Sequence, residues 1–163
     1  MLFEEIKNLI INQLDKSTII EANEKVLQPH FYIQTEKIAD VAKLLKANGF
    51  DQLACITGID NGEKIGTMEV IYNLYSILSA TPLTLKVKIG RNTENGQLPS
   101  VPTLAHVWRG ADWLERETYD LLGIHFEGHP DLRRILLPAD WQGFPLRKDY
   151  QTQEEYHGIK VKY

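Results

Sequence analysis

The 163-residue sequence predicts an α+β fold, a two-layer sandwich of a mixed or antiparallel sheet with helices, followed by an extended C-terminal arm. Hydrophobic periodicity gives the order helix, strand, helix, three strands, helix. Beyond these elements, prolines recur at Pro130, Pro138 and Pro145, which leaves little room for a helix. We therefore expect an α+β domain at residues 1–124 and an arm at residues 125–163. So long an irregular segment needs a surface to order against, either a partner or its own domain.

The first predicted elements are two helices with a strand between them. Apolar residues at helical spacing predict a helix at residues 2–14, and a strand is expected around Lys25–Ile33. Thr35 has the character of an N-cap, so the second helix should begin there. Asn48 and Gly49 should end it, because a left-handed residue commonly follows the last helical turn.

A β-rich block should follow the second helix. Leu53–Ile59 has the apolar character of a largely buried strand, and Asn61 with Gly62 predicts a hairpin turn after it, in a loop that Gly66 extends. Two further segments, Met68–Leu74 and Leu83–Ile89, alternate apolar and polar residues with a short turn between them. Such alternation is typical of half-buried strands.

The last predicted element of the domain is a helix from about Thr103 to Leu122, preceded by a polar loop at Arg91–Ser100. Gly110 falls within this helix and is expected to kink or divide it. Gly123 should end the helix.

Composition narrows the classes of function. The formal net charge is −4 and both signs are spread evenly, which argues against nucleic acid as the main partner. The N-terminus lacks the pattern of a secretion signal and no apolar run could span a bilayer, so we expect a protein on the cytoplasmic side. Cys55 is the only cysteine, too few thiols for an iron–sulfur cluster, and should be a small buried thiol. A chain of this kind would carry no electrons within a redox machine.

Tryptophan and arginine are concentrated late in the chain. All three tryptophans and five of the six arginines follow residue 100, with Arg91 the exception. Both residue types are enriched at binding hot spots, and the planar guanidinium pairs well with carboxylates. We expect Trp108 in the core and Trp141, in a proline-flanked segment, at an interface.

Potential catalytic groups form no convincing site. Glu115 and Glu117 point in different directions around a helix, so together with Arg116 they favour ion pairing over acid–base catalysis. His125 and His129 have the spacing of metal ligands, but the surrounding glycines and proline exclude one regular helix and no third ligand follows. No phosphate-binding glycine loop, dinucleotide fingerprint or nucleophile elbow occurs.

Two late segments resemble a known family. Residues 115–137, ERETYDLLGIHFEGHPDLRRILL, and residues 141–150, WQGFPLRKDY, strongly resemble the C-subunit family of NADH–quinone oxidoreductase, or respiratory complex I. Residues 69–76, EVIYNLYS, are also similar to the family. The family usually has a histidine where Phe144 stands and a proline where Gln151 stands. We expect the first departure to remove a polar contact from the arm and the second to loosen its exit.

The resemblance implies a non-redox structural and assembly subunit in the peripheral arm of that enzyme, on the cytoplasmic side of the membrane. Such a protein docks onto the D subunit, near the B subunit, contacts the membrane only through the complex and binds no nucleic acid. It holds no cofactor of its own, because FMN, the iron–sulfur clusters, NADH and quinone are bound elsewhere in the holoenzyme. That holoenzyme couples electron transfer from NADH to quinone to ion translocation. Truncation after Ile124 is expected to leave the domain folded and to abolish association with the D subunit.

The resemblance also implies which residues serve docking. Five are expected to brace the junction of domain and arm: Glu115, Arg116, Glu117, Tyr119 and Asp120. Seven are interface candidates: His129, Arg133, Arg134, Trp141, Arg147, Lys148 and Asp149.

Three other interpretations stay open. Similar proteins serve membrane-bound hydrogenase-like complexes and complexes fed by ferredoxin or a deazaflavin. A metal-dependent hydrolase would be built on His125 and His129. A small α+β RNA-binding module would use the cationic side chains of the arm, Arg133, Arg134, Arg147 and Lys148.

Overall fold

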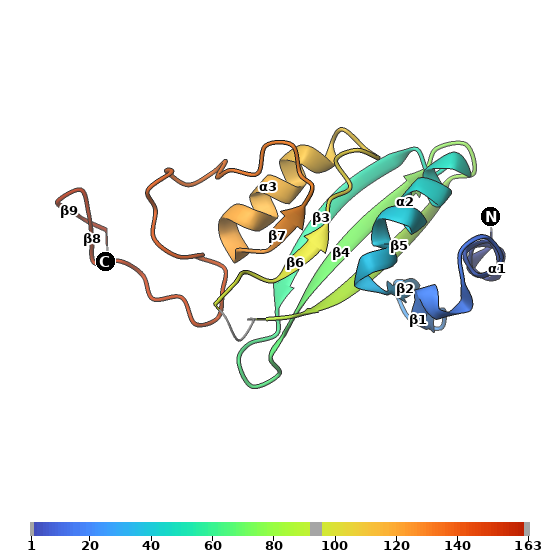
Figure 1. The fold of residues 1–163 in the computed structure, drawn as a ribbon, viewed down its shortest axis with the longest axis horizontal. Helices are drawn as coiled ribbons and strands as arrows, with labels where there is room; N and C mark the ends of the chain where they lie inside the picture. Colours follow the sequence, from blue (N-terminus) through green and yellow to red (C-terminus); the bar gives the residue numbers. More distant parts are fainter. Residues whose placement is uncertain (1, 92–95, 162–163) are drawn as a thin grey trace.

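A five-stranded sheet with the strand order β1-β2-β5-β4-β3 lies at the centre of the computed structural model, which describes residues 2–91 and 96–161 (Figure 1). Strands β2 and β5 are parallel and the other neighbours are antiparallel, so the sheet is mixed. The predicted α+β class is confirmed. The strands are β1 (Ile19–Asn23), β2 (His30–Ile33), β3 (Gln52–Asp60), β4 (Thr67–Ser76) and β5 (Thr81–Gly90).

Helices and two small sheets complete the described structure. The helices are α1 (Phe3–Gln13), α2 (Ile38–Ala47) and α3 (Ala111–Leu122), with the 3-10 turns η1 (Lys16–Thr18) and η2 (Thr35–Lys37). One small sheet pairs β6 (Ser100–Pro102) with β7 (His125–Glu127) in parallel, and the other pairs β8 (Glu155–Tyr156) with β9 (Ile159–Lys160).

Only one face of the large sheet is covered by helices. Alternation along β4 buries Met68, Val70 and Tyr72 on that face, where they join residues of α2 in one core. Gly58 of β3 lies so close to α3 that an added Cβ would stand 2.3 Å from a methyl group of Leu122. The opposite face carries polar side chains, as antiparallel pairs commonly do when one side faces water.

Local sequence patterns predicted the boundaries of several helices correctly. The helix predicted at residues 2–14 is α1, and the helix predicted from Thr35 begins with η2 and continues as α2. Gly49 and Gly123 follow α2 and α3 with φ of +92° and +66°, the left-handed region that glycine enters without strain. The predicted loop at residues 91–100 lies partly outside the described residues.

Three predictions near these elements were wrong. The strand expected around Lys25–Ile33 begins only at His30, and β1 was missed. The helix expected from Thr103 begins at Ala111, because the apolar residues before it pack from turns and not from a helix. Gly110 is consequently the residue that precedes α3, not a kink within it.

The prediction that β3 is largely buried was also wrong. Ala54 and Thr57 are exposed, and Cys55 is half-buried with its Sγ 3.4 Å from the Thr57 hydroxyl. These side chains point to the open face of the sheet. The apolar run at Leu53–Ile59 therefore predicted the strand correctly but not its burial, because only one face of β3 is covered.

The arm begins as part of the domain and then leaves it. Its first residues form β7, and Phe126 is 1% exposed within the core. The chain then runs without regular structure beside α3 and away from the end of the molecule that holds α1 (Figure 1). The hairpin β8–β9 lies at the far tip of the arm (Figure 1).

Candidate docking surface

The Asp120 carboxylate holds the arm against α3. Its side chain is fully buried, and its Oδ2 accepts hydrogen bonds from the consecutive N–H groups of Ile135, Leu136 and Leu137 at 3.0, 2.8 and 2.8 Å. Its Oδ1 lies 2.7 Å from Nη1 of Arg134. Burial alone would raise the pKa of Asp120, but these hydrogen bonds hold it below its ordinary value. Hydrogen bonds from residues of the arm therefore satisfy the buried carboxylate of Asp120 almost entirely.

Arg134 fixes the next loop of the arm. Beyond its pairing with Asp120, its Nη2 donates to the carbonyl oxygens of Trp141 and Gly143, both at 2.9 Å. Trp141 and Gly143, seven and nine residues after Arg134, are therefore held by the same guanidinium group. The planar fork of arginine suits this role, because its several N–H donors point in fixed directions.

Arg147 joins the arm to the end of α3. Its Nε donates to the carbonyl of Leu122 at 2.7 Å and its Nη2 to that of Gly123 at 3.2 Å. Backbone carbonyls in the last turn of a helix lack intrahelical partners and attract cations. The neighbouring Leu146 N–H donates to the Leu121 carbonyl at 3.0 Å. Burial, together with the charge of Arg91, lowers the pKa of Arg147.

Phe144 packs between these two arginines. The Arg134 and Arg147 guanidinium carbons lie 5.3 and 4.9 Å from the ring centroid, and Tyr119 meets the ring edge-on at 6.3 Å. A Cβ added at Gly123 would stand 2.5 Å from the Phe144 ring. Gly123 is therefore required both by its left-handed backbone and by this close approach. In place of the polar contact that a histidine could make here, Phe144 makes apolar and cation–π contacts.

A second anchor ties the arm to the far end of β3. Arg91 is 2% exposed and forms a bidentate pair with Asp60 at 2.7 and 3.1 Å. It also pairs with Asp149, and the N–H of Lys148 donates to Asp60 at 2.8 Å. Burial alone would raise the pKa of Asp60, but the hydrogen bonds from Arg91, Lys148 and Gly62 lower it to about 2.

Glu115 and His129 form a buried pair at the start of α3. Both side chains are fully buried, with His129 Nε2 3.9 Å from Glu115 Oε2. Glu115 accepts hydrogen bonds from the Thr103 hydroxyl and the Leu104 N–H. Burial raises the pKa of Glu115 to about 7, against the opposing effect of these two hydrogen bonds.

The tautomer of His129 follows from its contacts. Its Nδ1 accepts the N–H of Asp131 at 3.0 Å, so the proton sits on Nε2, which donates to the Asp112 carbonyl at 3.2 Å. Both ring nitrogens are therefore engaged within the chain, while His125 is exposed. In the part of the chain that the structure describes, no three His, Cys, Asp or Glu side chains are grouped to hold a metal ion. The metal-dependent hydrolase has no support in this arrangement.

The remaining candidates differ in their exposure, and Arg116 is buried at 8%. Glu117 and Arg133 are exposed, the latter paired with Asp131 at 2.8 Å, whereas Arg116 donates to carbonyl oxygens of the arm. Trp141 is half-buried, with its ring 5.2 Å from that of Tyr156.

Sequence reasoning missed several members of this arrangement. Asp60 and Arg91 were not singled out, because their partners in the arm are far away in sequence, as the 88 positions between Asp60 and Lys148 illustrate. Trp113 was also not chosen as an interface residue, yet it is 63% exposed. The sequence did hold a signal for this exposure. Trp113 lies on the outer side of the third predicted helix, and the charged Glu117 follows it one turn later on the same side.

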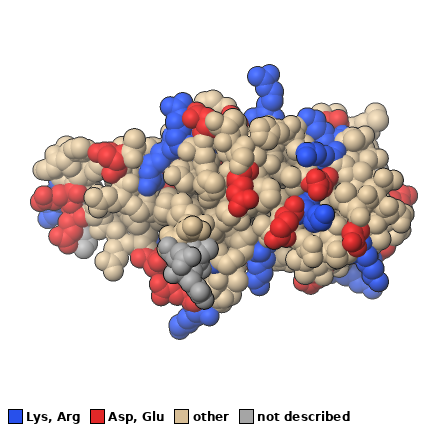
Figure 2. Space-filling view, viewed as in Figure 1, with Lys and Arg blue, Asp and Glu red and all other residues tan. Residues whose placement is uncertain are grey.

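The arrangement does not favour RNA binding. Arg134 and Arg147 point their guanidinium groups at carbonyl oxygens of the chain, so these donors are not presented to phosphates. Lys and Arg are interspersed with Asp and Glu on the face shown in Figure 2, without a continuous basic surface. Nucleic-acid-binding proteins usually present such a surface.

Comparison with known proteins assigns this chain to a family. Residues 31–156 match the family described as "Respiratory-chain NADH dehydrogenase, 30 Kd subunit". The chain belongs to this family. The C subunit of the NADH-quinone oxidoreductase of Chloroherpeton thalassium is 40% identical over 98% of the chain, which spans 65% of that relative. The C subunit of the Chlorobium phaeobacteroides enzyme is 43% identical over 91% of the chain and 88% of the relative.

Solved structures agree with the family assignment. A trypsin-resistant fragment of Nqo5 superimposes with a TM-score of 0.55 at 29% identity, covering 68% of this chain and 86% of the fragment. A chain of the membrane-bound sulfane sulfur reductase, an archaeal respiratory membrane complex, gives a TM-score of 0.74 at 24% identity over 91% of this chain and 84% of that chain. The second likeness concerns the fold alone. Across the described residues, this member of the 30 Kd family contains no helix long and apolar enough to span a membrane.

Proposed function

We propose that this chain is a non-redox structural component of the peripheral arm of NADH–quinone oxidoreductase, and that its C-terminal arm docks onto the D subunit of that enzyme. The conformation of the arm is the observation that supports this proposal. Buried charges fix its backbone in an open shape, while Leu136 and Leu146 remain 62% and 58% exposed. Apolar side chains displayed on a fixed, irregular backbone suit burial by another protein.

In the assembled enzyme, electrons pass from NADH to quinone with coupled ion translocation, and this chain contributes docking and rigidity. We place it on the cytoplasmic side, near the B subunit, in contact with the membrane only through the complex. The flavin, the clusters and the quinone site belong to other components of the enzyme. Two features support this division: a lone half-buried cysteine, and titratable groups of the arm that are engaged in holding its shape.

Truncation after Ile124 would be a poor test of docking. It would remove Phe126 from the core and leave the buried Asp120 and Asp60 carboxylates without their partners in the arm. Loss of association could then reflect unfolding.

Substitutions at exposed positions test docking more sharply. In the full chain, Leu136→Glu combined with Leu146→Glu should weaken association with the D subunit by about 10-fold or more, a loss typical of interface anchors. The melting temperature of the isolated chain should stay unchanged, because both side chains face solvent. Leu27→Glu, at a fully exposed position in the loop between β1 and β2, is the matched control. Wild-type affinity of the double variant would show that the arm is not the docking segment.

A related complex is the second candidate. The same fold occurs in a chain of the membrane-bound sulfane sulfur reductase, a different respiratory membrane complex. Identity to the NADH-quinone oxidoreductase relatives is higher, at 40% and 43%, so we favour that enzyme. Purifying the native complex through a tag on this chain and testing NADH oxidation would separate the two candidates.

A further inference from the structure

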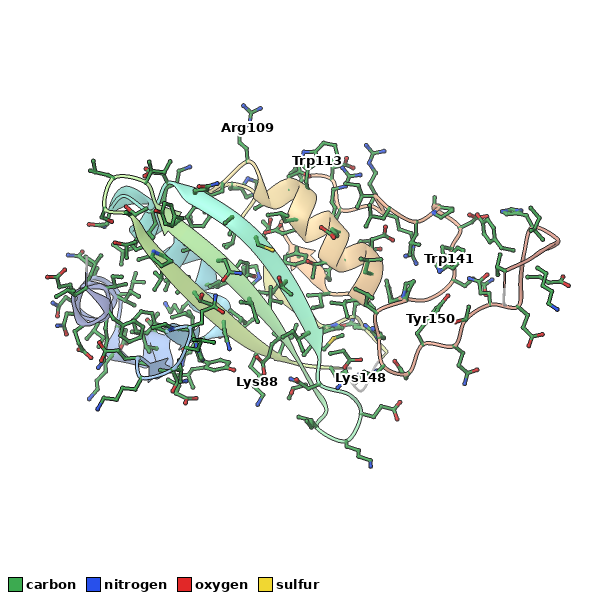
Figure 3. All side chains as sticks on the ribbon, turned by 180° about the vertical axis from the view of Figure 1, so that it is seen from behind. Lys88, Arg109, Trp113, Trp141, Lys148 and Tyr150 are labelled. Carbon is green, nitrogen blue, oxygen red and sulfur yellow. The ribbon has the colours of Figure 1, made fainter. Side chains whose placement is uncertain are left out.

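β3 forms one border of the large sheet, beside α3 (Figure 3). Within the described chain, the side of β3 that faces away from β4 pairs with no further strand. Such a free edge presents N–H and C=O groups that can pair with another chain. Folded proteins normally protect their free edges with short strands, charged side chains or bulges. The two borders of this sheet differ in that protection.

β1, at the opposite border, is protected. It has only five residues, and the exposed Glu21 lies at an irregularity in its register. β3 has nine residues and carries no charge before Asp60. Its irregularity, between Leu53 and Cys55, lies near one end. The rest of β3 is therefore a regular, uncharged border of the kind that pairs readily with another strand.

The phase of the β3–β4 ladder identifies the free backbone groups. The Asn61 N–H donates to the carbonyl of Thr67, which lies opposite it, at 3.1 Å. Hydrogen-bonded and non-hydrogen-bonded pairs alternate along an antiparallel ladder, so Thr57 directs its N–H and C=O to β4. Its neighbours Ile56 and Gly58 direct theirs to the free edge. Outside this ladder, the described residues provide no hydrogen-bond partner for the backbone groups of these two neighbours.

A groove runs along the free edge. Residues 55–58 of β3 line one side of it, Glu117 and Leu121 of α3 line the other, and Leu146 of the arm also contributes. An extended segment laid along β3 would place alternate side chains on the open face of the sheet and against α3. The groove thus offers a backbone to pair with and a helix to contact.

Two features of the groove indicate its occupant. Leu146 is 58% exposed and belongs to the proposed docking surface of the arm, so the protein that docks on the arm also reaches the groove. Glu117 is the charged side chain of the lining, and it has no ion-pair partner among the described residues. A cationic side chain in the added segment would complement it.

We propose that the free edge of β3 binds an extended segment of the docking partner as an additional strand of the sheet, with a Lys or Arg of that segment opposite Glu117. The inference rests on the proposed docking role of this chain and names the surface and the chemistry of the contact. Backbone hydrogen bonds to Ile56 and Gly58 supply affinity, and side-chain contacts with α3 supply specificity, as in other cases of strand addition.

Hydrogen exchange tests the backbone pairing. In the isolated full chain, the N–H groups of Ile56 and Gly58 should exchange about 100-fold faster than those of Thr57 and Ile59, which donate to β4. In the assembled complex the two fast groups should slow by about 100-fold or more, because the added strand accepts from them. Thr57 and Ile59 are the internal controls and should be slow in both states. Exchange at Ile56 and Gly58 that is equally fast in the complex would overturn the proposal.

Cross-linking identifies the occupant. A photo-reactive phenylalanine derivative replaces the exposed Thr57 in the full chain, and a matched variant carries it at Leu78, which is 94% exposed in the turn between β4 and β5. Position 57 should cross-link to one extended segment of a different protein of the complex, and position 78 should not reach that segment. Cross-links from position 57 only within the chain, or only between two copies of it, would contradict the assignment of the occupant.

Charge reversal tests the contact at Glu117. Glu117→Lys should weaken association by about 5-fold or more, and the difference from wild type should shrink as salt is raised. Glu36→Lys, at an exposed position in η2, is the matched control and should bind as wild type. The thermal unfolding of both variants should change little, because both side chains face solvent. Equal affinities of the two variants would rule out a cation opposite Glu117.

The two proposals fail separately. If Leu136→Glu loses affinity while the N–H groups of Ile56 and Gly58 stay fast in the complex, the docking role of the arm stands and the strand addition is wrong. If these N–H groups are protected while Leu136→Glu combined with Leu146→Glu keeps wild-type affinity, the strand addition stands without the arm.

Discussion

Asp120 Oδ1 lies 2.7 Å from Nη1 of Arg134, where the arm meets the buried side of α3. The carboxylate is fully buried and the guanidinium is 14% exposed, so this ion pair lies almost entirely out of water. Asp131 and Arg133 form a second pair nearby at 2.8 Å, but both of its members are more than half exposed. The same chemistry thus occurs once as a structural anchor and once as a surface contact.

This contrast gives the first prediction. Asp120→Ala should lower the free energy of unfolding by about 3–5 kcal/mol, because it removes the carboxylate that pairs with Arg134 and leaves three N–H groups of the arm without their acceptor. Asp131→Ala should cost about 0–1 kcal/mol, as is typical of exposed pairs. Urea unfolding of the two variants measures both values. Equal losses would mean that Asp120 does not hold the arm.

The second prediction concerns the close approach of Gly123 and Phe144. Gly123→Ala should lower the free energy of unfolding by about 2 kcal/mol or more, because alanine is strained at a φ of +66° and its Cβ would overlap the Phe144 ring. Gly90→Ala is the control, since nothing lies within 4 Å of the position of its Cβ. The substitution should also remove the near-ultraviolet circular dichroism contributed by the Phe144 region. A Gly123 variant as stable as the Gly90 variant would contradict this packing.

The third prediction is a dependence of stability on pH that originates at Glu115. Burial raises its folded-state pKa to about 7, above an ordinary value of 4.5, so the folded chain binds this proton more tightly than the unfolded chain. The contribution of Glu115 to stability is thus fully present below about pH 4.5 and is lost as pH rises through 7. The loss should be on the order of 3 kcal/mol.

Glu115→Gln removes this titration. Its amide oxygen can accept from the Leu104 N–H, and its amide nitrogen can donate to the Thr103 hydroxyl oxygen. The difference in unfolding free energy between wild type and variant, measured by urea unfolding from about pH 4.5 to about pH 8.5, should move in favour of the variant as pH rises. Glu117→Gln, on the exposed side of the same helix, is the control. A difference that is constant over this range would show that Glu115 does not titrate there.

The fourth prediction tests whether Arg147 holds the arm in position or contacts the partner protein directly. Arg147→Ala should weaken docking by about 1–3 kcal/mol, in the range usual for interface arginines. Since Arg147 holds the last carbonyls of α3, the variant should also loosen the arm in the isolated chain. Hydrogen exchange at the Leu146 N–H, which donates to Leu121, should accelerate, and Arg133→Ala should leave it unchanged. Weaker docking without faster exchange would make Arg147 a direct contact instead.

Local patterns predicted the parts of the fold that depend on local physics. Alternation identified β4 and β5, and the glycines at positions 49 and 123 marked helix ends because their backbones need the left-handed region. The predicted helix from Thr103 failed because apolar residues at helical spacing also occur in turns that pack against a core. β1 was missed because its short sequence, IIEAN, has no clear alternation.

The candidate site was predictable in part only. From sequence, Asp120 was singled out as a brace between domain and arm, and Arg134 and Arg147 as contacts to a partner. All three are engaged with this chain's own backbone. Pairings such as Asp60 with Arg91 depend on the complete fold and leave no local trace. Exposure likewise separates Trp113 from Trp141, and sequence alone does not give it.

The anchors of the arm have a consequence for synthesis. Asp60 and Arg91 emerge from the ribosome well before Lys148 and Asp149, which complete their hydrogen bonds. Until then the growing chain carries charges that its interior does not yet satisfy, and water must keep access to them. We therefore expect a chain that ends before residue 148 to be less stable than the full chain, because this buried pair lacks both of its partners in the arm.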